Sequence, residues 1–135
     1  MGVSGVVLYL VLLCFGATIS PGVGVAGSML ALVPPAVTDF AHVPAYGVLT
    51  WLLASALQEQ RWPKHMALRI AVVAAMVFGV CMELAQGFAP GRSADPRDVA
   101  LNAVGITLAL LLVAPTQEHP VYTVARRFLP LLNRH

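Results

Sequence analysis

Four long apolar runs follow one another along the chain, separated by polar residues, glycines and prolines. The runs cover residues 3–19, 41–57, 68–88 and 98–114, so each is 17 to 21 residues long. A helix needs about 20 residues to cross the hydrocarbon core of a bilayer. Because a backbone surrounded by lipid must pair its hydrogen-bonding groups within its own segment, the runs are predicted to be helices. The pattern predicts an all-α fold, an integral membrane bundle of four transmembrane helices.

The composition agrees with a membrane protein. Hydrophobic residues make up 59% of the chain and charged residues 10%, against about 25% charged residues in globular proteins. This excludes an ordinary soluble enzyme and a disordered chain. The net charge of +2 comes with scattered basic residues, so we expect no nucleic-acid partner. The predicted partner is the lipid bilayer, and a homodimer stays open because four short helices make a thin bundle.

Basic residues indicate how the helices are oriented. Six lie in or beside the 58–67 loop or in the C-terminal tail: Arg61, Lys64, Arg69, Arg126, Arg127 and Arg134. Only Arg92 and Arg97 lie at the opposite end. The positive-inside rule then predicts that both termini are cytoplasmic and that residues 20–40 and 89–97 face outward. The first run has no preceding Lys or Arg, unlike a secretory signal peptide, so we expect it to be retained.

The whole chain, residues 1–135, is predicted to be a single domain. Its tail, residues 116–135, carries apolar residues at helical spacing and is predicted to lie along the inner membrane interface. Cys14 and Cys81 fall inside apolar runs and are interpreted as small membrane-buried side chains.

Polar residues gather in pairs at the outward ends of three predicted helices. The pairs are Asp39 with His42, Glu83 with Gln86, and Asp98 with Asn102. Residues three or four positions apart share a helical face, and ionisable residues retained at a membrane span are costly and mark functional sites. The pairs therefore predict one outward-facing polar site.

The residue types suggest roles within this site. His42 is the candidate base, oriented by Asp39, and Glu83 is the candidate acid, so these three are the predicted catalytic residues. Arg92 has a planar guanidinium that suits phosphate or carboxylate groups. The predicted substrate-binding residues are Arg92, Gln86, Asp98, Asn102, Ser93 and Tyr46.

Purely structural interpretations stay open for the same residues. Asp39 and Asp98 can be favourable charges at helix N-termini, with Asp98 as the cap of its helix. Glu83 can belong to a salt bridge that pins a loop. Gly47 and Gly79 suit close helix packing. The acidic surplus at this end would accept a divalent cation, but spacing alone identifies no metal site.

The motifs together resemble the VanZ-like family. The resemblance rests on Asp39-x-x-His42 with Tyr46 one turn later, Glu83-x-x-Gln86, Pro90-Gly91-Arg92-Ser93, and Asp98-x-x-x-Asn102-x-x-Gly105. It covers residues 39–105, about half of the chain. The chain departs from the family pattern at Phe40, where the family commonly has Lys.

The resemblance implies a small multi-pass protein of the bacterial plasma membrane, in a family linked to teicoplanin resistance. Two functions stay open. In the first, the outward site binds the head of an envelope lipid or glycan precursor and acts on it by acid/base chemistry. In the second, the chain is a non-catalytic accessory protein that affects lipoglycopeptide susceptibility or docks a partner membrane protein. A transporter is less favoured, because few polar residues continue the site through the membrane.

Overall fold

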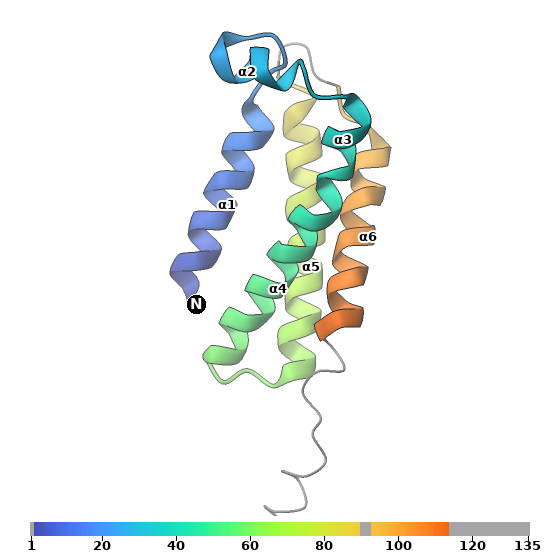
Figure 1. Ribbon diagram of the computed structural model, residues 1–135. Helices are drawn as coiled ribbons and strands as arrows, with labels where there is room; N and C mark the ends of the chain where they lie inside the picture. Colours follow the sequence, from blue (N-terminus) through green and yellow to red (C-terminus); the bar gives the residue numbers. More distant parts are fainter. Residues whose placement is uncertain (1, 90–92, 114–135) are drawn as a thin grey trace, which may run out of the picture.

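The computed structural model describes residues 2–89 and 93–113, and within these ranges all regular structure is helical (Figure 1). The helices are α1 (Val3–Thr18), α2 (Gly24–Leu30), α3 (Pro35–Phe40), α4 (His42–Glu59), α5 (Lys64–Gln86) and α6 (Pro96–Val113). The all-α prediction is confirmed for this part of the chain. The predicted interfacial tail, residues 116–135, and Arg92 lie outside the described residues.

Three segments are long and apolar enough to cross a membrane: Pro35–Glu59, Lys64–Gln86 and Pro96–Val113. Helix α1 is also apolar but has only 16 residues. Many outward side chains of these helices are large and apolar; Phe15, Val73 and Leu111 are more than half exposed. Such a surface suits lipid, so the helices have the character of a membrane protein. The count of four spans remains a prediction.

Helix α4 is central to the bundle. The long helices α1, α4, α5 and α6 alternate in direction, and α4 contacts the other three, most extensively α6 (Figure 1). The core contains Tyr46 and Leu49 of α4, Ala75 of α5 and Ile106 of α6.

Small residues set how closely the helices approach. In α5 the residues Ala67, Ala71, Ala75 and Gly79 follow one another at four-residue spacing, and all are buried. In the contact of α4 with α6, a Cβ atom added to Gly105 would overlap the carbonyl of Val43. These helices therefore approach along backbones that carry little side-chain bulk.

The other two glycines at the helix contacts serve packing in the same way. A Cβ atom on Gly47 would lie 3.3 Å from the carbonyl oxygen of Gly105, and one on Gly79 would lie 3.0 Å from the amide nitrogen of Asn102. The packing interpretation of Gly47 and Gly79 is confirmed.

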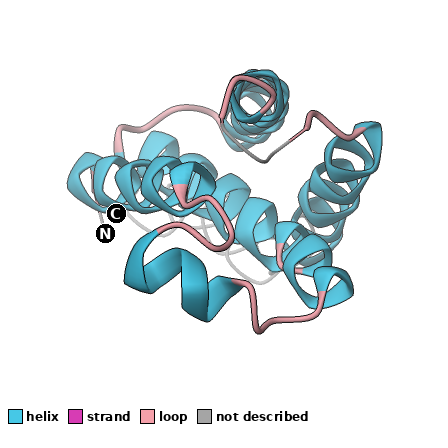
Figure 2. Cartoon of the chain, turned by 90° about the horizontal axis from the view of Figure 1, so that it is seen from above, coloured by secondary structure: helices cyan, strands magenta, loops and turns pink. Residues whose placement is uncertain are grey.

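Helices α2 and α3 lie at the end of the bundle where α1 ends and α4 begins, the end seen from above in Figure 2. The sequence predicted only an outward loop for residues 20–40. A short interruption at Ala41 separates α3 from α4. Its cause is Pro44, which has no N–H to donate to the carbonyl of Phe40 four residues earlier.

Candidate functional site

Six polar residues from three helices meet at one end of the bundle. Helices α4 and α6 begin there and α5 ends there, so the first turns of two helices face the last turns of the third (Figure 1). We refer to these residues as the polar cluster: His42 and Tyr46 of α4, Glu83 and Gln86 of α5, and Asp98 and Asn102 of α6.

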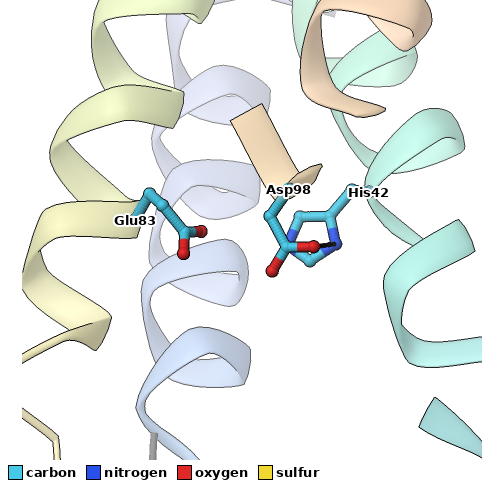
Figure 3. A group of neighbouring side chains, drawn as sticks. All are labelled: His42, Glu83 and Asp98. Carbon is cyan, nitrogen blue, oxygen red and sulfur yellow. Dashed lines mark ion pairs between the residues drawn. The ribbon is translucent and has the colours of Figure 1, made fainter. Parts of the chain in front are cut away.

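The centre of the polar cluster is the group His42, Glu83 and Asp98. Their side chains point toward one another from three helices (Figure 3), and one donor atom from each lies within 4.8 Å of the others. His42 Nδ1 lies 3.9 Å from Asp98 Oδ1. Glu83 is only 5% exposed. Two carboxyl groups and an imidazole thus share a small, mostly buried space.

The ring of His42 is oriented by the main chain. Its Nδ1 lies 3.0 Å from the carbonyl oxygen of Asp39. A carbonyl oxygen can only accept, so Nδ1 carries the proton of this hydrogen bond and a neutral ring has its lone pair on Nε2. The ring also stacks on Tyr46, with centroids 6.4 Å apart.

This arrangement differs from the expected role of the Asp39 side chain. Asp39 is exposed, and the group that orients the ring is its backbone oxygen. Helix carbonyls point toward the C-terminus of their helix, so the Asp39 carbonyl faces residue 42, whereas the Asp39 side chain is exposed. The carboxylate beside His42 belongs to Asp98.

Glu83 connects α5 to the segment that precedes α6. Its Oε1 accepts a hydrogen bond from the backbone N–H of Asp95. Asp95 Oδ1 in turn accepts from the backbone N–H of Arg97, 2.8 Å away, and Pro96 begins the helix. Asp95 therefore caps α6 with proline at the first helical position. The interpretation of Asp98 as the cap is wrong, because α6 begins two residues earlier; Asp98 lies in its first turn.

Asn102 is the most deeply buried polar side chain of the cluster, 2% exposed. Its Oδ1 has no hydrogen-bond partner among the described residues. Its amide nitrogen lies against Gly79.

A cleft of about 250 Å³ opens beside the polar cluster. His42, Tyr46 and Gln86 form part of its wall, and apolar residues of α1, among them Leu12 and Leu13, form another part. The cleft therefore presents hydrogen-bonding groups and an apolar surface to the same occupant.

A family model described as VanZ/LLP1 matches residues 5–116. The chain belongs to the VanZ/LLP1 family. The match confirms the resemblance found between residues 39 and 105, and it extends over α1. No curated protein and no solved structure matches the chain.

The structure brings together six of the nine residues predicted for the site of this VanZ/LLP1 protein, namely the six of the polar cluster. Asp39 contributes its backbone oxygen, Ser93 is exposed in the segment before α6, and Arg92 lies outside the described residues. Asp95 was not predicted as a site residue. Its signal was the Asp-Pro pair, which marks a capped helix start.

Proposed function

We propose that this VanZ/LLP1 protein crosses the bacterial plasma membrane four times and binds the head of an envelope lipid or lipid-linked glycan precursor at the exterior face. Both termini are cytoplasmic in this arrangement. Membership of the family and the apolar helices support the membrane location. The binding site is the polar cluster together with the adjoining cleft.

The observation that carries the proposal is the mixed lining of the cleft. A lipid-linked molecule has a polar head joined to an apolar chain, and a matching site needs both surfaces side by side. Here His42, Tyr46 and Gln86 face the same space as Leu12 and Leu13 of α1. The head then lies against the polar cluster while the chain follows α1 toward the lipid.

The proposed orientation follows from the basic residues at the other end of the bundle. Arg61 lies in the connection between α4 and α5, and Lys64 and Arg69 lie in the first turns of α5. The positive-inside rule favours the cytoplasm for this end. The polar cluster, at the opposite end, then faces the exterior, where envelope precursors are used.

The proposed chemistry is acid/base hydrolysis of a phosphate ester in the head. A water oxygen forms a bond to phosphorus while a proton of the water moves to Nε2 of His42. The bond from phosphorus to the alcohol oxygen breaks, and a protonated Glu83 donates a proton to that oxygen. The hydrogen bond from Nδ1 to Asp39 supports this role, because it leaves Nε2 as the basic nitrogen.

A second candidate is an accessory protein that binds the same head without a covalent step. The hydrogen bond from the Asp95 N–H to Glu83 favours it, because a carboxyl group that holds the loop is less free to exchange protons. Such a protein would affect lipoglycopeptide susceptibility by retaining a precursor or by docking a partner membrane protein.

The test uses the full-length protein in detergent micelles with a polyprenyl phosphate ester as the probe. We expect saturable binding and release of inorganic phosphate, with release abolished in His42→Ala. The matched control is His65→Ala, which removes an exposed histidine near the start of α5 and should leave both readouts unchanged.

The outcomes separate the candidates. Equal phosphate release by His42→Ala removes this residue from the mechanism, and saturable binding without product supports the accessory protein. Absence of both binding and release, in protein with native helix content, contradicts the proposed function.

A further inference from the structure

Two carboxyl groups and an imidazole converge in a space that suits a metal ion. Bonds from a metal to histidine nitrogen or carboxylate oxygen are about 2.0–2.2 Å long, so two donor atoms of one ion lie no more than about 4.4 Å apart. The donor atoms of His42, Glu83 and Asp98 all lie within 4.8 Å of one another. Small rotations of the side chains would bring them to bonding distance.

The hydrogen bonds around these donors match those of metal ligands. A ligating histidine commonly donates its other ring N–H to a backbone carbonyl, which fixes the ring and the tautomer. His42 Nδ1 lies 3.0 Å from the Asp39 carbonyl, which fixes the ring beside the Asp98 carboxylate; with Nδ1 as the hydrogen-bond donor, Nε2 would be the metal ligand. Glu83 accepts the Asp95 N–H through Oε1, and this bond orients the carboxylate while its second oxygen remains available.

Asn102 supplies an independent indication of a ligand. Its Oδ1 is buried without a hydrogen-bond partner among the described residues, and an unsatisfied buried acceptor is costly. Helical side chains lean toward the N-terminus of their helix, and Asp98 lies one turn away in that direction on α6. Asn102 follows Asp98 by one turn on the same face of α6, so a water bound to an ion beside Asp98 would be a donor for its oxygen.

The charge of the group also favours a cation. Glu83 and Asp98 are carboxyl groups in a mostly buried space, where opposite charge would hold a cation beside them. A divalent cation there would also attract the phosphate of a bound head.

We infer that His42, Glu83 and Asp98 bind one divalent transition-metal ion, and that Asn102 supports it from the next turn of α6. An imidazole together with carboxylates suits Zn²⁺ or Mn²⁺ better than Mg²⁺. The inference rests on the proposed function in that His42, one of the three ligands, also lines the cleft that receives the head. With the ion bound, His42 and Glu83 would be ligands in place of the base and the acid, and the ion would supply Lewis-acid chemistry by lowering the pKa of a bound water.

The test measures metal content directly. Full-length protein in detergent micelles is stripped with a chelator, equilibrated with Zn²⁺ or Mn²⁺ alone, and passed through a desalting column before elemental analysis. We expect one ion per chain in the wild type and affinity at least about tenfold lower in Glu83→Gln. Glutamine keeps an acceptor for the Asp95 N–H, so this variant removes the charge and retains the tie to the loop.

Two further variants and two controls complete the series. His42→Ala should also lose the ion, and Asn102→Ala should weaken binding about 10- to 100-fold, the effect typical of a group that supports a ligand. The controls are His65→Ala and Glu59→Gln, which change exposed residues away from the polar cluster. Helix content by circular dichroism establishes that each variant is folded.

Failure of this inference differs from failure of the proposed function. No retained ion in the folded wild type overturns the metal site, and so does equal loss of the ion in the controls. Phosphate release that resists the chelator in a metal-free protein would keep the proposed function with His42 as the base. A retained ion without binding or release of the lipid probe would keep the metal site and contradict the proposed function.

Discussion

Glu83 lies where the face of small residues on α5 reaches the polar end of the bundle. It follows Ala71, Ala75 and Gly79 at the same four-residue spacing, and like them it is buried. A charged side chain in the middle of a span costs about 2.5–3.5 kcal/mol on insertion scales. The Asp95 N–H and the nearby His42 offset part of this cost. An alanine would continue the packing of α5 without that cost, so packing alone does not account for a carboxylate here.

At the same scale, Gly105 is predicted to be essential for the contact between α4 and α6. In Gly105→Ala the added methyl group would overlap the Val43 carbonyl, a backbone atom that cannot rotate away. Overpacking of this kind costs about 1–3 kcal/mol. We expect the free energy of unfolding, measured by SDS titration in mixed micelles, to fall by that amount.

The matched control for this substitution is Gly5→Ala in α1, where an added Cβ has no atom within 4 Å. Alanine is favoured over glycine inside a helix by roughly 0.5–1 kcal/mol, so this variant should be unchanged or slightly more stable. Equal stability of Gly105→Ala and the wild type would show that α4 and α6 do not approach this closely.

Among the elements, α1 is attached to the bundle by the most limited set of contacts of the four long helices. It contacts α4 and α5 through apolar side chains such as Val6 and Leu13, and polar side chains add to this packing. Tyr9 donates a hydrogen bond to the Ala45 carbonyl at 3.0 Å, and the sulfur atoms of Cys14 and Met82 lie 3.9 Å apart. Because α1 also forms a wall of the cleft, its position sets the width of that space.

Tyr9→Phe is therefore predicted to loosen α1 while the rest of the bundle stays folded. The variant removes one hydrogen bond, worth about 0.5–1.5 kcal/mol, and keeps the aromatic ring. We expect faster hydrogen exchange in residues 3–18 and little change in α5 and α6. Uniformly faster exchange across all helices would contradict this, because it would mean that α1 unfolds together with the bundle.

The long helices could be predicted from the sequence, because runs of apolar residues bounded by proline, glycine or charge leave little choice in lipid. Helices α2 and α3 could not, since each has fewer than eight residues and lies in a segment without a long apolar run. The convergence of polar pairs on one end followed from helical spacing and alternating direction. The contacts inside the polar cluster did not, because they depend on the break at Ala41 and on the cap at Asp95.

For the molecule as a whole, the decisive prediction concerns which end faces outward. In a background with Cys14 and Cys81 replaced by alanine, single cysteines at Ser93 and at Gln60 report on the two ends, and both positions are exposed. A maleimide that cannot cross membranes, added to intact cells, should label Ser93→Cys but label Gln60→Cys only after the membrane is opened.

This pattern follows from the basic residues near the connection of α4 with α5, which the positive-inside rule assigns to the cytoplasm. The reverse labelling would place the polar cluster inside the cell, and its ligand would then be a cytoplasmic molecule in place of an exterior envelope precursor. Labelling of both positions in intact cells would contradict a membrane-spanning arrangement of α4 and α5, because these helices connect the two ends. The metal site would survive either outcome, since it depends on the distances among three side chains and not on the side of the membrane they face.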